Sequence, residues 1–126
     1  MKPILLVIDD EENMLALLSK VLGKEGYQIL CASSGAEGLA LAEKNRVDLA
    51  LVDYSMAGMD GLTVLQNLKS AHPRLPAILI TAFPTWEMEN KAKDLGCLDY
   101  LTKPLDMKRL KERIKNILKH SMVEGG

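Results

Sequence analysis

The segment Ile4-Leu-Leu-Val-Ile-Asp-Asp-Glu-Glu12 sets an apolar run of five residues directly before four consecutive acids. Four more short apolar runs follow along the chain, and most are continuous rather than alternating in polarity. Continuous runs of this length are typical of strands that are covered on both faces, as in a parallel sheet. We therefore predict five strands, at Ile4–Ile8, Gln28–Ala32, Leu49–Val52, Ala77–Ile80 and Leu98–Leu101.

Helical periodicity fills the stretches between these runs. The apolar spacing of one helix face recurs in Met14, Leu17, Leu18 and Val21, in Val64, Leu65 and Leu68, in Met88, Ala92 and Leu95, and in Leu110, Ile114, Ile117 and Leu118. Gly26 is a stop signal for the first helix, and Ser34 with Glu37 is typical of a capping box that opens the second. Pro84 suits the first turn of the fourth helix.

Strand and helix thus alternate five times, which predicts an α/β fold of the (βα)5 type. Such a pattern forms a doubly wound parallel sheet with helices on both faces and right-handed crossovers. We expect one domain over residues 1–120. Residues 121–126, Ser-Met-Val-Glu-Gly-Gly, have no core to join and are expected to form a flexible tail.

Composition narrows the class of protein. The chain has 126 residues, of which 48% are hydrophobic and 26% charged, which is ordinary for a soluble domain with its own core. Residues 1–60 carry five Lys or Arg against ten Asp or Glu, whereas residues 61–126 carry eleven against seven. The acidic first half argues against direct nucleic-acid binding and suits a divalent cation.

The cysteines and the start of the chain indicate the cellular compartment of the protein. Cys31 and Cys97 lie far apart without metal-type spacing, so we interpret them as buried thiols in a reducing compartment. The first apolar run is too short for a secretory signal or a membrane span. The expectation is a cytoplasmic protein with no membrane contact.

Polar residues follow four of the five predicted strands. Asp9 to Glu12 follow the first, Asp53 the third, Thr81 the fourth and Lys103 the fifth, whereas the second ends in Cys-Ala-Ser without a charge. In an open parallel sheet, ligands bind beyond the carboxyl ends of the strands. Each residue alone has a plainer role, such as a helix-dipole acid, a turn residue or a solvated lysine. Their joint placement favours a site.

The residue types at this edge indicate a reaction. Carboxylates that converge there repel one another and raise each other's pKa, and Mg²⁺ relieves this because it accepts a few carboxylates, waters and a phosphate oxygen. Asp53 can act as a nucleophile and form an aspartyl-phosphate. Lys103 and the Thr81 hydroxyl would stabilise charge on the phosphoryl oxygens. The sequence therefore predicts phosphoryl transfer to Asp53.

These residues also carry a family resemblance. The segments are Ile4–Glu11, Leu51–Gly61 with Asp53, Ile80-Thr-Ala82, and Asp99-Tyr-Leu-Thr-Lys-Pro104, in this order. The chain closely resembles the receiver domain of two-component response regulators over residues 3–120. The resemblance implies a flavodoxin-like fold with strand order 2-1-3-4-5.

The family pattern implies a role for each matching residue. Asp10 would bind Mg²⁺ directly and Asp9 through water, while Asp53 would be both metal ligand and phosphoacceptor. The Ser55 carbonyl would complete the protein ligands. The Lys103–Pro104 peptide bond is expected to be cis.

The resemblance also implies a switch and its partners. Thr81 and Tyr100 would be the coupled switch pair, with Thr81 moving toward the phosphoryl group and the Tyr100 ring swinging inward. Asp53 would receive its phosphoryl group from a histidine kinase or a histidine phosphotransferase. The surface that responds would comprise the fourth helix, the fifth strand and the last helix, and it would serve a homodimer, an output domain or another partner. The domain would catalyse its own phosphorylation and slow dephosphorylation without being a turnover enzyme.

Three positions depart from the family pattern. Ala57 stands where proline is usual, which we expect to loosen the loop without loss of chemistry. Ser55 and Phe83 stand where relatives that lose phosphate quickly often have an amide or acid to orient water. A small hydroxyl and a phenyl ring should do this poorly, so we predict a long-lived phosphorylated form.

Other interpretations stay open at this stage. An aspartate-nucleophile phosphatase would need a general acid where Ser55 stands, and a flavin-binding electron carrier would need a donor-rich phosphate loop where the four acids stand. A degenerate receiver that only docks is a third alternative. The basic last helix, Met107–His120, is interpreted as a solvated face, and Trp86 as either a packing residue or a partner contact. The chain either works alone or belongs to a longer regulator.

Overall fold

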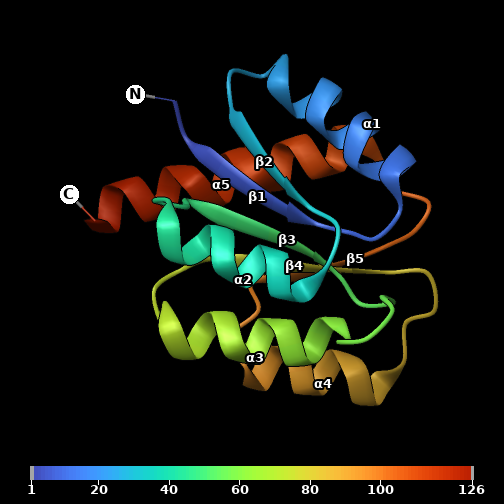
Figure 1. The fold of residues 1–126 in the computed structure, drawn as a ribbon. Coiled ribbons are helices and arrows are strands. Elements are labelled where there is room, and N and C mark those ends of the chain that lie inside the picture. Colours follow the sequence, from blue (N-terminus) through green and yellow to red (C-terminus); the bar gives the residue numbers. More distant parts are fainter. Residues whose placement is uncertain (1, 126) are drawn as a thin grey trace.

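A computed structural model describes the backbone of residues 2–125 and the side chains of residues 2–120. Five parallel strands form one sheet in the order β2-β1-β3-β4-β5 (Figure 1). The strands are β1 (Ile4–Ile8), β2 (Gln28–Ala32), β3 (Leu49–Asp53), β4 (Ala77–Thr81) and β5 (Asp99–Thr102). The helices are α1 (Glu12–Gly23), α2 (Gly35–Lys44), α3 (Gly61–Ala71), α4 (Trp86–Asp94) and α5 (Met107–Gly125). The predicted fold class and strand order are confirmed.

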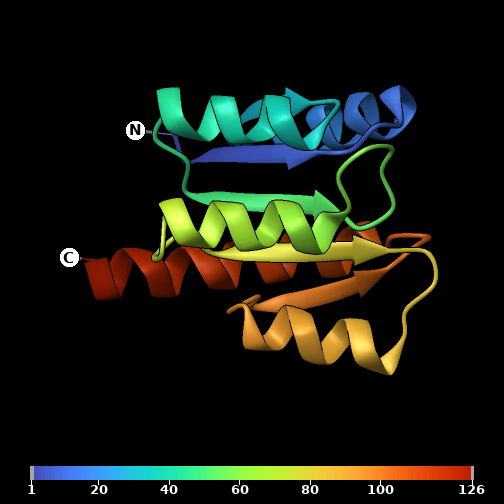
Figure 2. The ribbon, with the colours of Figure 1, turned by 60° about the horizontal axis from the view of Figure 1, so that its bottom comes forward.

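The helices cover both faces of the sheet, as Figures 1 and 2 show. Alternate residues of each strand point to opposite faces, so Leu6 and Ile8 pack beneath α2, α3 and α4 whereas Leu5 and Val7 pack beneath α1 and α5. Both clusters consist of buried side chains that are nearly all aliphatic. Burial on two faces is the physical reason why the strands read as continuous apolar runs.

Short polar side chains start three of the helices. Ser34, Asp60 and Thr85 each accept a backbone N–H three residues on, from Glu37, Thr63 and Met88 respectively, at 2.8–3.1 Å. The Ser34 cap confirms the predicted start of α2. The acid of the expected capping box instead accepts a hydrogen bond from the Ser33 hydroxyl at 3.3 Å.

Two helix boundaries differ from expectation. Helix α1 ends at Gly23, three residues before the predicted stop, and Gly26 lies in the following turn with φ +95°. Pro84 lies outside α4, because the Thr85 side chain caps the helix and the first helical residue is Trp86. A third difference is Leu17, which is 44% exposed while Leu18 and Leu22 are buried, so the apolar stripe of α1 is rotated from the predicted one.

Strand ends also shift by a residue. Asp53 and Thr81 belong to the last positions of β3 and β4, and β5 begins at Asp99 rather than Leu98. Leu98 donates its N–H to the Ala77 carbonyl at 3.0 Å but is 54% exposed, so it lies at the sheet margin. The sequence prediction included Leu98 in the strand because it is apolar, although it is exposed in the structure.

Several other expectations concern the ends and the thiols. Cys31 and Cys97 are both free and partly buried. No helix within residues 2–125 has the length and apolarity that crossing a membrane would require. The expectation of a flexible tail falls on residues 121–126, whose side chains lie outside the described residues, and it stays a prediction.

Candidate functional site

The register of the sheet places the predicted site residues side by side. Ile8 pairs with Val52, which sets Asp9 beside Asp53 one step further along both strands. Asp53 pairs with Ile80, so Thr81 follows directly on the neighbouring strand. The N–H of Lys103 donates to the Thr81 carbonyl at 2.8 Å. Residues far apart in the sequence thus meet at the carboxyl edge of the sheet, which is the right-hand edge in Figure 2.

Three carboxylates form a compact cluster at this edge. One oxygen from each of Asp9, Asp10 and Asp53 lies within 4.8 Å of the others. Asp9 and Asp53 are each only 2% exposed, whereas Asp10 is exposed. The loop after β1 is held in place because Asp9 Oδ1 accepts the Glu11 N–H at 2.9 Å and Asp10 Oδ2 accepts the Ala57 N–H at 3.1 Å. Hard oxygen ligands at this spacing suit a small divalent cation.

Lys103 supplies the positive charge within the cluster. Its Nζ lies 3.3 Å from Asp53 Oδ1, 3.6 Å from Asp9 Oδ2 and 3.3 Å from Glu11 Oε1. The contact to Asp53 is an ion pair without hydrogen-bond geometry, so among the described residues Asp53 Oδ1 has no hydrogen-bond donor. The Lys103–Pro104 peptide bond is cis, as the resemblance implied.

The electrostatics of the cluster favour protonation of its buried acids. Burial first, and then the neighbouring Asp9 carboxylate, raise the pKa of Asp53 from 3.8 to about 6, although Lys103 and a backbone N–H from Ser55 act to lower it. Burial also raises the pKa of Asp9. Burial acts to lower the pKa of Lys103, but the Asp53 and Asp9 carboxylates outweigh it and raise the pKa overall. One ammonium therefore does not balance these carboxylates, and a further cation would.

Thr81 and the segment after it border the carboxylate cluster. The Thr81 side chain is buried, and its Oγ1 accepts the Phe83 N–H at 3.2 Å. Any movement of this hydroxyl toward a group on Asp53 would therefore change the contact that holds the start of the β4–α4 segment. Phe83 itself is 82% exposed and does not cover the site.

The surface predicted to respond also carries specific contacts. Tyr100 is partly buried on β5, and burial, together with the charge of Glu89 on α4, raises its pKa. Asp99 on the same strand accepts a hydrogen bond from Arg113 Nε of α5 at 2.6 Å. Strand β5 is thus joined to α5 by an ion pair.

Trp86, at the first position of α4, is 75% exposed. A core-packing role for this side chain is therefore wrong, because it lies in solvent. Trp86 and Phe83 are the only tryptophan and phenylalanine of the chain, and both are exposed and lie within five residues of Thr81 in the sequence. The interpretation of Trp86 as a partner contact stays open.

Some features of the site were missed by reasoning from the sequence. Glu11 was grouped only with the acids after β1, yet it is the third carboxylate around Lys103. The Ala57 backbone N–H that holds Asp10, and the ion pair of Asp99 with Arg113, carry no signal in the sequence. The role of the Ser55 carbonyl depends on a bound ion and stays a prediction.

Comparison with known proteins places these features in one family. Residues 5–115 match the family model described as the response regulator receiver domain. The chain is 38% identical over 121 residues to the transcriptional regulatory protein ZraR of Salmonella typhimurium, and it covers 27% of that protein. It is 34% identical over 114 residues to sporulation initiation phosphotransferase F of Bacillus subtilis, and it covers 92% of that relative.

Solved structures give the same result for the fold. A CheY-like response regulator receiver domain protein from Methanospirillum hungatei superimposes with a TM-score of 0.96 at 28% sequence identity. The alignment covers 98% of this chain and 99% of that one. A full-length similarity of this degree extends from the sheet to the loops that carry the carboxylates.

Proposed function

Because the chain belongs to the family of response regulator receiver domains of two-component systems, we propose that it accepts a phosphoryl group on Asp53 in a magnesium-dependent reaction. The donor would be a phosphohistidine of a histidine kinase or a histidine phosphotransferase. The P–N bond breaks, the imidazole nitrogen keeps the electron pair, and an Asp53 carboxylate oxygen forms the new P–O bond. One observation carries the proposal: the carboxylates of Asp9, Asp10 and Asp53 converge at one edge of the sheet, and the single ammonium beside Asp9 and Asp53 does not balance them.

The metal ligands proposed are Asp10, Asp53 and the Ser55 carbonyl, with Asp9 acting through water. Mg²⁺, when bound, would supply charge that draws a phosphoryl oxygen toward the carboxylates and offsets their repulsion. The donor set fits this ion because it consists only of oxygen atoms and because Asp53 Oδ1 is buried without a hydrogen-bond donor among the described residues.

Two side chains, Lys103 and Thr81, would stabilise negative charge on the phosphoryl oxygens during the transfer. Lys103, with its Nζ 3.3 Å from Asp53 Oδ1, would neutralise charge on a phosphoryl oxygen. The Thr81 hydroxyl would donate a hydrogen bond to another oxygen after giving up its contact with the Phe83 N–H. Lys103 would act with little reorganisation, because its ammonium already lies beside Asp53, whereas the Thr81 hydroxyl would have to move toward the phosphoryl group.

The same contacts would bias a two-state switch. A phosphoryl group shifts an equilibrium only through contacts that differ between the states. The movement of Thr81 and the inward turn of Tyr100 would alter the surface formed by α4, β5 and α5. We propose that this surface serves a homodimer, an output domain or another partner. The relatives named as transcriptional regulators are much longer than this chain, so the output remains a proposal.

We predict that the phosphorylated form is long-lived. Ser55 and the exposed Phe83 offer no amide or carboxylate to orient an attacking water. The protein should be phosphorylated with acetyl phosphate and Mg²⁺, freed of both, and followed by intact mass. Failure to gain a phosphoryl group would argue against the proposed function. A half-life of only seconds would leave that function standing but contradict the predicted slow hydrolysis.

A further inference from the structure

A second charged feature lies at the opposite edge of the sheet, where the strands begin. A hollow of about 500 Å³ opens there between the end of α3, the α3–β4 loop, the residue before β5 and residues 113–120 of α5. Its cationic lining consists of Lys69, Arg74 and Arg113, His120 also lines it, and no carboxylate is among the lining residues. Three cations from three segments thus converge on one hollow.

Two of these cations are fixed in orientation. The Lys69 Nζ donates to the carbonyls of Pro73 and Leu75, at 3.0 Å each, which leaves one of its three N–H groups unused by these contacts. Arg113 donates through Nε to Asp99 at 2.6 Å, and that contact does not use the two Nη groups. Fixed donors lose little freedom when an anion binds, so they bind it more tightly than mobile ones.

The hollow also has an apolar part. Leu98 is 54% exposed, and Pro76 and Ile117 line the hollow beside it. An inorganic anion would leave this surface uncovered. A ligand with an acidic group and an apolar body would use both parts of the lining.

A plainer role explains only part of this arrangement. Lys69 lies in the last turn of α3, where a cation offsets the helix dipole. Arg74 lies in a loop and Arg113 in the middle of α5, so neither is explained by a helix end. Arg113 also pairs with Asp99 through Nε, but that contact does not account for its Nη groups or for Arg74.

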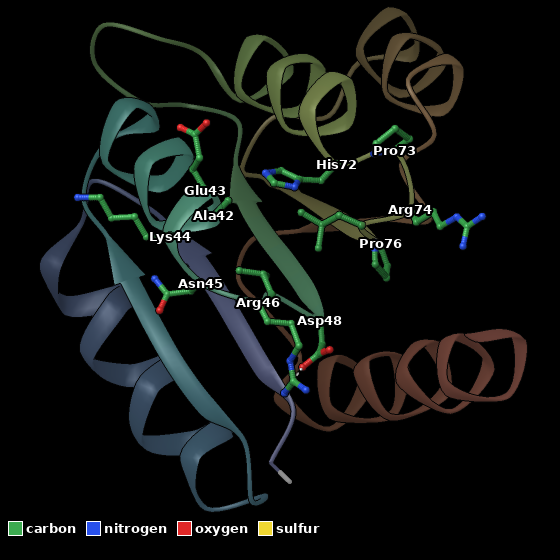
Figure 3. A pocket seen from close by; sticks show the side chains of 12 residues that line it. Ala42, Glu43, Lys44, Asn45, Arg46, Asp48, His72, Pro73, Arg74 and Pro76 are labelled. Carbon is green, nitrogen blue, oxygen red and sulfur yellow. Dashed lines mark ion pairs between the residues drawn. The ribbon is translucent and has the colours of Figure 1, made fainter. Parts of the chain in front are cut away.

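The neighbouring hollow provides a contrast (Figure 3). It measures about 790 Å³ and shares Arg74 and Pro76 with the first, but its lining includes the carboxylates of Glu43 and Asp48. Arg46 faces Asp48 at 3.3 Å, while the side chain of Arg74 points away from that pair (Figure 3). This hollow thus has three cations and two carboxylates in its lining, whereas the lining of the hollow beside α5 has three cations and no carboxylate.

We propose that the hollow between α3 and α5 binds a small organic anion, with a carboxylate or phosphate group on an apolar body. The acidic group would contact Arg74 and the Nη groups of Arg113, and the apolar body would cover Leu98. The volume lies within the range of small-molecule sites. This proposal is independent of phosphorylation, because the hollow lies at the other edge of the sheet.

Phenyl phosphate is the probe that tests this site. It should be titrated into ¹⁵N-labelled protein without Mg²⁺, so that the carboxylate cluster repels it. The Leu98 amide and the Arg113 Nε–H signals are expected to shift and saturate, and the Ala57 amide should not move. Inorganic phosphate should bind more weakly, and neutral benzyl alcohol should give no saturating shift.

A matched pair of variants locates the binding. Arg74→Gln removes an exposed cation of the hollow and should weaken binding about tenfold, the typical effect of one charge-assisted hydrogen bond. Lys108→Gln removes the same charge at the far end of α5 and should leave the affinity unchanged. The proposal is overturned if the probe causes no saturating shift, if benzyl alcohol shifts the same signals, or if both variants bind like the wild type.

Discussion

Replacing Lys103 with glutamine is expected to slow the phosphorylation of Asp53 by about 100- to 1,000-fold. Removal of one preorganised group that stabilises developing oxyanion charge typically has an effect of this size. Here the ammonium lies 3.3 Å from one oxygen of the Asp53 carboxylate, and Asp9 and Glu11 also hold it there. The rate should be measured with acetyl phosphate at saturating Mg²⁺, by intact mass.

Metal binding separates this role from a structural one. Lys103→Gln removes a cation that competes for the same carboxylates, so Mg²⁺ affinity, measured by calorimetry, should be no weaker than in the wild type. Lys91→Gln, an exposed charge on α4, serves as the matched control and should be phosphorylated at the normal rate. A Lys103→Gln protein that reacts as fast as the control would show that the ammonium has no part in the transfer.

Replacing Asp53 with asparagine is expected to stabilise the metal-free protein at pH 7.5, by up to about 3 kcal/mol. The reason is that burial and the Asp9 charge raise the pKa of Asp53 from 3.8 to about 6 in the folded state. An ionised Asp53 is therefore unfavourable in the fold even with Lys103 beside it. Neutral asparagine keeps the size of the side chain and removes that cost.

The stability difference between Asp53→Asn and the wild type should depend on pH. The folded protein holds the Asp53 proton more tightly than the unfolded chain, so the stability of the wild type due to this group falls as pH rises from about 4 to about 6. The gain in unfolding free energy of Asp53→Asn over the wild type should reach its full value above about pH 6 and vanish below about pH 4. Urea unfolding at several pH values measures it, with the exposed Asp94→Asn as control.

Magnesium should reverse the order of stability. The ion binds the folded wild type and stabilises it by mass action, whereas the asparagine variant lacks one of the proposed ligands. A variant that is less stable than the wild type at pH 7.5 without metal would contradict the electrostatic account of the cluster.

The fold was largely predictable because its signals are local and repeated. The apolar runs that became β1 and β2 have the predicted boundaries, since burial on both faces demands continuous aliphatic residues. The predictions for Leu17 and Leu98 were wrong because the sequence alone does not distinguish an exposed leucine from a buried one. The start of α4 was misplaced because Thr85 and Pro84 both suit a helix start, and only the side-chain hydrogen bond of Thr85 selects one.

The site was predictable to a different extent. Asp9, Asp53, Thr81 and Lys103 could be brought together because parallel strands end at one edge, and the sheet register confirms that neighbourhood. The contact of Glu11 with Lys103 depends on a side-chain conformation, which spacing does not encode. The cationic hollow beside α5 joins residues of three segments, so no linear motif could indicate it.

The most direct test is to find where the phosphoryl group goes. Wild-type protein and Asp53→Asn should both be treated with acetyl phosphate and Mg²⁺, and the acyl-phosphate should be trapped by reduction and mapped by peptide mass spectrometry. A single modified position at Asp53, with no incorporation in the variant, is the expected result. Equal incorporation into Asp53→Asn, or a modification that maps to Asp9 or Asp10 in the wild type, would contradict the assignment of Asp53 as the phosphoacceptor.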